Sequence, residues 1–231
     1  MRILGLIPAR GGSKSVPGKN IKKLEGKPLL QYTVEVAEDV KNIAKLILSS
    51  DDDAIIEVAK SLNLEVPFKR PSDLAKDNTP TLPVIQHALR FFEAQNIYFD
   101  AVCLLQVTSP FKTSEFIDSA IKKFIDTKAD ALVSVQKIPE EYNPYWAFKP
   151  NKDGYIELAS GEKDIIARRQ DLPITYHRDG LIYITKTEVI LNKNSLYGEK
   201  ISYIESPKES AINIDTMLDW SRAIAYLQSK K

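Results

Sequence analysis

The chain has 231 residues, with 32 Lys and Arg against 31 Asp and Glu, so its net charge is close to zero. Such a balance gives no indication of nucleic-acid binding, and any cationic site must therefore be local. Hydrophobic residues make up 43% of the chain, which is normal for a globular protein with a core of useful size. We expect one domain, residues 1–231.

The chain has a single cysteine, Cys103, which excludes an internal disulfide and suits a reducing compartment. The apolar run at residues 3–7 is too short for a signal peptide or a membrane span. No later run approaches the roughly 20 apolar residues that a spanning helix needs. We therefore expect a cytoplasmic protein with neither a membrane segment nor a nucleic-acid partner.

Apolar runs alternate with amphipathic patterns through the first 135 residues. The continuous apolar runs predict buried strands at 3–7, 46–48, 101–105 and 131–135, with a short strand at 65–68. Apolar residues at helical spacing predict helices at 29–40, from 51 to about 62, at 79–95, and around 116–124. This alternation predicts an α/β fold, in which a mainly parallel, Rossmann-like sheet carries helices on both faces.

The pattern changes after residue 136. Residues 137–176 are rich in Pro, Asn, Asp and aromatic residues, with strand-like pieces around a turn at 151–154. We interpret them as a small β-rich excursion from the sheet, whose aromatic side chains suggest an interface. Strand character returns at 181–184 and 201–204, and a helix is predicted at 217–227.

A glycine-rich and cationic segment directly follows the first predicted strand: Pro8-Ala-Arg-Gly-Gly-Ser-Lys-Ser-Val-Pro-Gly-Lys-Asn-Ile21. Glycines let backbone N–H groups approach an anion, and the cations Arg10, Lys14 and Lys19 can neutralise phosphate charge. The spacing is not that of a Walker A motif, because five residues separate Gly12 from Gly18. The position past a strand's carboxyl end is where α/β sheets bind ligands, so the segment predicts a phosphate-binding loop.

This loop resembles the N-terminal signature of the acylneuraminate cytidylyltransferases, the CMP-sialic acid synthetase family. The following residues 22–33 resemble the wider sugar nucleotidyltransferases, whereas the Gly-Gly-Ser-Lys and Lys-Asn-Ile segments favour the sialic acid branch. The resemblance implies a nucleotidyltransferase fold with a dimerisation excursion at 137–176. It also implies CTP and a nonulosonic acid as substrates, Mg²⁺ as cofactor, and a homodimer whose sites are completed across the interface.

The resemblance extends to Lys69-Arg-Pro-Ser-Asp-Leu-Ala-Lys-Asp-Asn-Thr-Pro-Thr81, which it places around the cytidine. Asp77 and Thr79 are equally suited to cap the following helix, and this alternative stays open for Asp77. The implied nucleotide-binding residues are Arg10, Gly11, Gly12, Ser13, Lys14, Lys19, Asn20, Arg70, Asp77 and Thr81.

Two further segments resemble the family around the acceptor sugar. The first is Leu104-Leu-Gln-Val-Thr-Ser-Pro110, in which Val107 stands where the family usually has Pro. The second comprises residues 168–173 and 176–183, whose arginines suit a sugar carboxylate but are equally typical of a solvated surface cluster. The implied sugar-binding residues are Gln106, Thr108, Ser109, Arg168, Arg169, Gln170, Arg178 and Tyr183.

The last resembling segment, Asn213-Ile-Asp-Thr-Met-Leu-Asp219, precedes the final predicted helix. In an extended chain, residues 213 and 215 point the same way and could face a Mg²⁺ ion on the CTP phosphates. The family usually has Asp at both positions, so Asn213 retains an oxygen but loses a charge. Helix capping is the alternative role for Asp215. The implied metal ligands are Asp215 and Asn213, and the implied catalytic residues are Arg10, Lys14, Lys19 and Asp215.

The favoured hypothesis is a cytidylyltransferase in which the anomeric hydroxyl of the sugar attacks the α-phosphorus of CTP and pyrophosphate leaves. No general base is evident. The alternatives are a guanylyl or other nucleotidyltransferase acting on an amino sugar, and a catalytically silent sugar-nucleotide-binding protein. A glycosyltransferase using the acidic run 51–53 is a third. The sequence does not choose among sialic, legionaminic and pseudaminic acids.

Overall fold

The computed structural model describes residues 1–208 and 212–230, which are built around a six-stranded sheet in the order β10-β6-β9-β5-β1-β4. Five strands share one direction, and β9 runs against its neighbours β5 and β6. The mainly parallel sheet confirms the sequence-based prediction. The strands are β1 (Ile3–Pro8), β4 (Lys45–Ser49), β5 (Ala101–Leu104), β6 (Ala131–Lys137), β9 (Tyr176–Lys186) and β10 (Ile201–Glu205).

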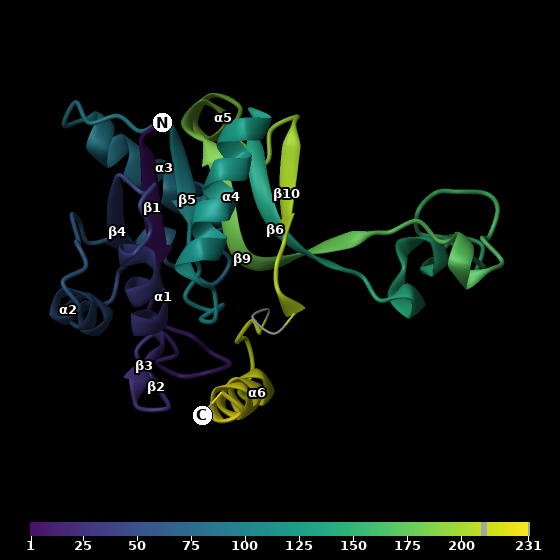
Figure 1. The fold of residues 1–231 in the computed structure, drawn as a ribbon, viewed down its shortest axis with the longest axis horizontal. Helices are drawn as coiled ribbons and strands as arrows, with labels where there is room; N and C mark the ends of the chain where they lie inside the picture. The colour runs from purple at the N-terminus through teal and green to yellow at the C-terminus, as the bar shows by residue number, and fades with distance from the viewer. Residues whose placement is uncertain (209–211, 231) are drawn as a thin grey trace.

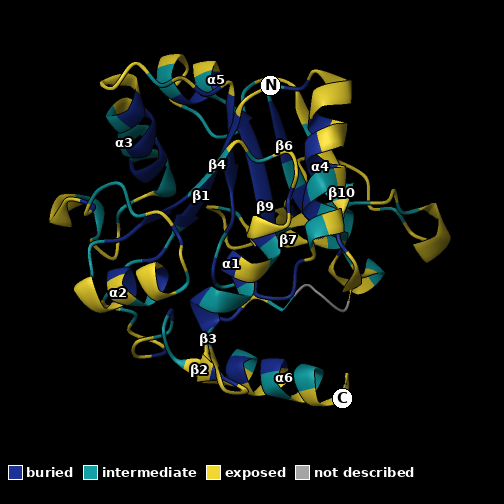
Figure 2. Ribbon diagram, turned by 60° about the vertical axis from the view of Figure 1, so that its left-hand side comes forward, coloured by how far each residue is buried: buried dark blue, intermediate teal, exposed yellow. Residues whose placement is uncertain are grey.

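Helices cover both faces of this sheet, as predicted (Figure 1). Along β1, Ile3 and Ile7 pack into one hydrophobic cluster, whereas Leu4 and Leu6 pack into another, as side-chain alternation along a strand requires. Buried side chains of α1 (Leu29–Glu38), α2 (Asp53–Ser61), α4 (Ser114–Thr127) and α6 (Met217–Gln228) join the first cluster. Those of α3 (Thr81–Glu93) and α5 (Thr187–Asn192) join the second. The dark blue strands between helices in Figure 2 mark this two-sided core.

Two local predictions need correction, and a third is confirmed. The predicted strand at 65–68 is reduced to isolated bridges from Ile47 to Glu65 and from Ser50 to Lys69. Helix α3 begins at Thr81, and its N-cap is Pro80 with no side-chain cap, so the predicted capping by Asp77 or Thr79 is wrong. The acidic run does open a helix as predicted: Asp52 caps α2 by accepting the Ile55 N–H.

The segment between β6 and β9 projects away from the sheet (Figure 1). The two strands continue outward as a ribbon, pairing Lys137 with Tyr176, and a β-bulge between Val133 and Val135 interrupts their register. The buried Asn143 organises the tip, because its amide donates to the Pro173 carbonyl and its oxygen accepts the Tyr145 N–H. The tip holds a hairpin of β7 (Phe148–Pro150) and β8 (Ile156–Leu158) with short 3₁₀ turns η2 (Glu140–Tyr142), η3 (Pro144–Trp146) and η4 (Arg169–Asp171). We call residues 137–176 the extension.

Two small elements surround the beginning of α1 and the approach to α3. The hairpin of β2 (Lys23–Leu24) and β3 (Lys27–Pro28) leads from the predicted phosphate-binding loop into α1. The 3₁₀ turn η1 (Ser72–Leu74) lies between α2 and α3. None of the helices in the described part of the chain combines the length and apolar character needed to span a bilayer.

Candidate active site

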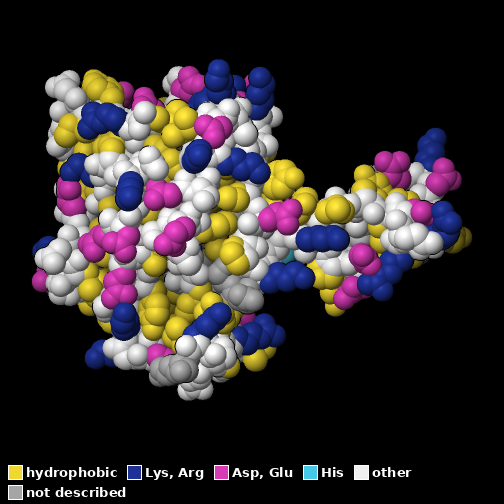
Figure 3. Space-filling view, in the orientation of Figure 1, with side chains coloured by type: hydrophobic (Ala, Val, Ile, Leu, Met, Phe, Trp, Pro, Cys, Tyr) yellow, Lys and Arg dark blue, Asp and Glu magenta, His cyan; other side chains and the backbone are white. Residues whose placement is uncertain are grey.

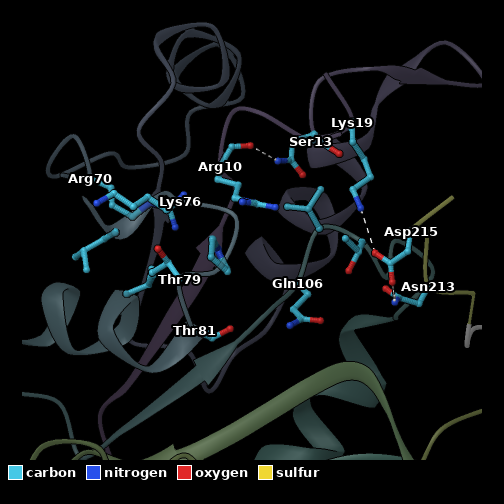
Figure 4. A pocket seen from close by; sticks show the side chains of 16 residues that line it. Arg10, Ser13, Lys19, Arg70, Lys76, Thr79, Thr81, Gln106, Asn213 and Asp215 are labelled. Carbon is cyan, nitrogen blue, oxygen red and sulfur yellow. Dashed lines mark hydrogen bonds and ion pairs between the residues drawn. The ribbon is translucent and has the colours of Figure 1, made fainter. Parts of the chain in front are cut away.

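A cavity of about 410 Å³ lies where the parallel strands end at their carboxyl ends. Segments that are far apart in the sequence contribute its walls: the loop after β1, the approach to α3, the turn after β5 and the residues before α6. Figure 4 shows Arg70, Lys76, Thr79 and Thr81 on one side, Lys19 and Asp215 on the other, and Arg10 between them. The sequence-predicted residues that line it are Arg10, Ser13, Lys19, Asn20, Arg70, Thr81, Gln106, Thr108, Asn213 and Asp215.

The loop after β1 folds tightly around backbone contacts. Gly12 and Gly18 have φ angles of +61° and +62°, a region that glycine enters without steric cost. Gly11 approaches α2 so closely that an added Cβ would lie 2.9 Å from an Asp52 carboxylate oxygen. The buried Asn20 closes the loop by donating its amide to the Arg10 carbonyl at 2.9 Å. The Gly11 N–H donates to Asp51 Oδ1 at 3.1 Å, so that amide is already engaged with protein.

The three predicted phosphate-binding cations have different surroundings. Arg10 lines the cavity and its Nη1 lies 2.7 Å from Asp77 Oδ1. Lys14 is 83% exposed and contacts the other oxygen of Asp77 from outside the cavity lining, at 2.5 Å. Lys14 above all, with Arg10 in addition, lowers the pKa of Asp77. Lys19 is only 12% exposed, and its ammonium donates to the Ile214 carbonyl at 2.7 Å and to Asp215 at 3.2 Å.

Arg70 brings a buried positive charge to the opposite wall. Its backbone N–H bonds to the Ser50 carbonyl beyond β4, and its Nη2 lies 3.2 Å from Asp51 Oδ1. Burial lowers the pKa of Arg70, because desolvation penalises the guanidinium more than Asp51 stabilises it. Its buried Nε has no hydrogen-bond partner among the described residues. Lys76 also lines this wall, although the sequence analysis did not single it out within residues 69–81.

The turn after β5 joins the predicted sugar-binding residues to the predicted metal ligands. Gln106 and Thr108 line the cavity, and the Thr108 carbonyl accepts the Ile214 N–H at 2.7 Å. The buried Ser109 donates its hydroxyl to Asn213 Oδ1 at 3.4 Å. Two segments about 105 residues apart in the sequence therefore form one surface. Beneath the turn lies Lys112, which the sequence reasoning did not single out.

The other predicted sugar-binding residues do not line this cavity within the single chain. Arg178 donates to the Tyr197 hydroxyl at 2.6 Å, and Tyr183 is buried in the sheet opposite Leu104. Gly180, on the same strand β9, lies close to the turn after β5. A Cβ added at Gly180 would lie 3.2 Å from Gln106 Oε1. Three residues lie on the extension: Arg168 pairs with Asp171, Arg169 pairs with Glu140, and Gln170 is the middle residue of η4.

Asp215 and Asn213 form the acidic corner of the cavity. The Asn213 amide donates to Asp215 Oδ2 at 2.6 Å, so both oxygen-bearing side chains face the same space. Helix α6 is capped instead by Thr216 in a capping box with Asp219, which excludes the capping alternative for Asp215. Residues 1–208 and 212–230 hold no group of three or more acidic, His or Cys side chains arranged to hold a metal ion. The Asp215 carboxylate and the Asn213 amide oxygen fit Mg²⁺, which usually keeps several water ligands and binds phosphate oxygens together with one or two carboxylates.

Comparison with known proteins shows relatives along nearly the whole chain. A curated pseudaminic acid cytidylyltransferase of Campylobacter jejuni is 34% identical over 95% of this chain and 93% of its own length. A CMP-N,N'-diacetyllegionaminic acid synthase of Legionella pneumophila is 35% identical over 96% and 94%. An N-acylneuraminate cytidylyltransferase of Escherichia coli is 32% identical over 99% of this chain and 53% of its own length.

Solved structures agree with these relatives at the level of the fold. A CMP:2-keto-3-deoxy-manno-octonic acid synthetase complexed with CTP superposes with a TM-score of 0.74 over 100% of both chains, at 16% identity. A 4-diphosphocytidyl-2C-methyl-D-erythritol synthase from Anaerococcus prevotii gives a TM-score of 0.68 over 98% of both, at 18% identity. Residues 4–227 match the family described as cytidylyltransferase. The chain therefore belongs to the cytidylyltransferase family.

Proposed function

We propose that this cytidylyltransferase transfers the cytidylyl group of CTP to a nonulosonic acid of the sialic, legionaminic or pseudaminic type and releases pyrophosphate. One observation carries the proposal: a single cavity joins the cationic loop after β1 to Gln106 and to the Asn213–Asp215 corner. The residues proposed to bind the triphosphate, the sugar and the metal ion thus line one site. Relatives with all three sugar specificities, each about one third identical, support this acceptor class.

In the proposed reaction, the anomeric hydroxyl oxygen bonds to the α-phosphorus while the bond from that phosphorus to the bridging oxygen breaks. Pyrophosphate leaves with the bridging oxygen, and the hydroxyl proton passes to solvent or to a base that we leave unassigned. Such chemistry depends on positioning and charge stabilisation. Arg10 and Lys19 would hold the triphosphate, Arg70 with Thr81 would frame the nucleoside, and Gln106 would hydrogen-bond the sugar.

Magnesium is the cofactor we propose for the acidic corner. Asp215 would supply a carboxylate and Asn213 its amide oxygen, which already lies within reach of Ser109. When bound, Mg²⁺ would neutralise charge on the phosphates. The Lys19 ammonium contacts Asp215 and would keep the corner close to charge balance when no nucleotide is present.

We further propose a cytoplasmic homodimer in which a second copy covers the extension. Exposed hydrophobic side chains support this, and Figure 3 shows them among charges of both signs on the visible face of the extension. Its most exposed apolar residues are Tyr142, Tyr155, Ile156, Ile165 and Ile174. In such an assembly Arg168 and Arg169, which lie away from the cavity of their own chain, would become available to the sugar bound by the partner.

The test is pyrophosphate release from CTP and Mg²⁺ with a panel of sialic, legionaminic and pseudaminic acids. We expect release with at least one of these acids, and no release when CTP is replaced by GTP, ATP or UTP. A matched reaction with Kdo, an eight-carbon acidic sugar, controls for acceptor size. Release with GTP and an amino sugar would overturn the proposal in favour of a guanylyltransferase. CTP binding without release under any condition would indicate a silent binding protein.

A further inference from the structure

The turn after β5 rests on a lysine in the interior of the protein. Lys112 is 3% exposed, although lysine is among the residue types least often buried without a charged partner. No ion pair joins it to a carboxylate within the described ranges. Burial lowers its pKa to about 7 because desolvation penalises the ammonium, and the facing titratable group, the Cys103 thiol, only weakly opposes this. Such a costly arrangement requires a structural reason.

The hydrogen bonds of Lys112 supply that reason. Its Nζ donates to the Gln106 carbonyl at 2.9 Å, to the Ser109 carbonyl at 2.5 Å and to the Thr33 hydroxyl at 3.3 Å. An ammonium has three N–H donors and no acceptor, so these three oxygens match its full donor capacity. Two of the three belong to the ends of the turn whose middle residues, Val107 and Thr108, line the cavity.

The third partner connects the turn to the nucleotide side of the site. Thr33 is fully buried in α1, and the same helix accepts the end of the loop after β1, because the Leu30 N–H bonds to the Asn20 carbonyl at 2.8 Å. On its other side the turn bonds to Ile214 through the Thr108 carbonyl. Lys112 therefore joins the turn to α1, the helix that also bonds to the loop after β1, while Lys112 itself is not among the residues that line the cavity.

We propose that Lys112 is a positioning residue that fixes the Gln106–Ser109 turn against α1 and so sets where the acceptor sugar lies relative to the nucleotide. This inference rests on the proposed function, because it assigns the turn to the sugar. Lys112 itself touches no substrate in this arrangement. It acts through the Gln106 and Ser109 carbonyls. Two of its ammonium hydrogens bond to these carbonyls, and the third bonds to the Thr33 hydroxyl on α1.

The principal test compares Lys112→Met with Lys112→Arg. Methionine keeps most of the volume but has no donor, whereas arginine keeps several donors and a fixed charge. For Lys112→Met we expect kcat to fall about 100-fold and the KM for the sugar acid to rise about ten-fold, in line with losing a positioned reactant. The KM for CTP should change less than three-fold. Lys112→Arg should recover part of the loss. Because arginine keeps its proton, the kcat of this variant should not decline as pH rises above about 7, where Lys112 of the wild type loses its charge.

A second variant keeps the inference testable if Lys112→Met fails to fold. Thr33→Val preserves shape and removes only the third acceptor, so we expect a smaller rise in the KM for the sugar acid. In a Lys112→Met background the same change should add nothing, because the two residues act as one unit. Ile190→Ala, buried in the cluster on the other face of the sheet, is the control for lost stability alone. It should lower the melting temperature while leaving both KM values unchanged.

Hydrogen exchange separates this inference from the proposed function. In the free protein, Lys112→Met should speed amide exchange at least ten-fold in residues 105–111, with no comparable change in Ile190→Ala. Unchanged exchange together with sugar-acid KM and kcat values within two-fold of wild type would overturn the inference while leaving the cytidylyltransferase intact. Faster exchange in a wild-type protein that uses no nonulosonic acid would instead sink the acceptor assignment and leave the turn's dependence on Lys112 standing.

Discussion

Arg10 and Asp77 lie 2.7 Å apart, and their ion pair connects the loop after β1 to the segment that precedes α3. Lys14 reaches the second oxygen of the same carboxylate, so one side chain pairs with two of the three cations expected to bind phosphate. The sequence implied that Asp77 contacts the nucleotide. In the structure its carboxylate pairs with these two cations, so under the proposed function an incoming triphosphate would compete with Asp77 for them.

Removing the Asp77 charge should favour the nucleotide. Asp77→Asn leaves Arg10 and Lys14 free of a competing carboxylate, and we expect the Kd for CTP to fall by about two- to five-fold, the scale of an exposed ion pair. Titration calorimetry with CTP checks this directly. Glu57→Gln, which removes an exposed carboxylate paired with Lys60 on α2 and away from the cavity lining, is the matched control. A weaker affinity in Asp77→Asn would show that the carboxylate serves the nucleotide itself.

Arg10 should be needed for turnover but not for folding. Its side chain is partly exposed and its one ion pair lies at the surface, so Arg10→Ala should change the melting temperature little. We expect kcat/KM for CTP to fall about 100- to 1,000-fold, as when one preorganised charge stabiliser is lost. The exposed Arg90→Ala on α3 controls for general loss of positive charge. Near-normal turnover by Arg10→Ala would exclude the role assigned to Arg10.

The acidic corner should determine the magnesium requirement. Asp215→Asn removes its one carboxylate, so we expect activity to fall at least about ten-fold and half-maximal activity to need more Mg²⁺. Asn213→Asp adds a second carboxylate and should lower the Mg²⁺ concentration for half-maximal activity. Magnesium titrations of pyrophosphate release measure both, with the exposed Asp153→Asn as control. If all four proteins respond identically to Mg²⁺, the metal is held elsewhere.

The cap of α6 should contribute stability that depends on pH. Thr216→Ala removes the capping hydroxyl, so the free energy of unfolding should fall by about 1 kcal/mol at pH 7. The Thr216 side chain is the main cause of the lowered pKa of Asp219. A lowered carboxyl pKa gives stability that is present above the unfolded value and is lost as pH falls through the folded one. Denaturation from pH 7 to pH 3 should therefore show the difference shrinking below about pH 4.

Ser221→Ala, on the same helix but away from the cap, is the control for this series, because its hydroxyl only bonds back to the Met217 carbonyl. A difference between Thr216→Ala and wild type that stays constant down to pH 3 would mean that Asp219 does not participate in the cap energetics. The cap also fixes the residue next to Asp215, so a parallel shift in the Mg²⁺ requirement is expected in Thr216→Ala.

The extension should control the oligomeric state. Tyr155→Glu with Ile156→Lys places opposite charges on two exposed apolar residues of the hairpin region, which should disrupt a hydrophobic interface. We expect sedimentation equilibrium to show a dimer for the wild type and a monomer for the double variant. Tyr98→Glu, at an exposed position on the body of the protein, should stay dimeric. A wild-type monomer at micromolar concentration would exclude the proposed assembly.

The fold class and the position of the glycine-rich, cationic loop after β1 could be predicted from the sequence, because both depend on short-range information. Continuous apolar runs identify strands buried on both faces, and glycines beside Arg10 and Lys19 identify a loop suited to phosphate. The same is true of the helix opened by the acidic run 51–53, where the capping signal lies within a few residues. Side-chain alternation and capping involve residues close together in the chain, so they can be recognised from the sequence.

Which distant residues meet depends on long-range packing and could not be predicted from the sequence. The antiparallel direction of β9 follows from the course of the extension, so the sequences of the two strands do not by themselves predict that Tyr183 pairs with Leu104. The burial of Lys112 and the ion pair between Asp77 and Arg10 likewise depend on long-range packing. In sequence, a lysine after Ser-Pro-Phe is a surface charge by default, since solvation favours exposure. Its three oxygen partners come from β5's turn and from α1, and only folding brings them together.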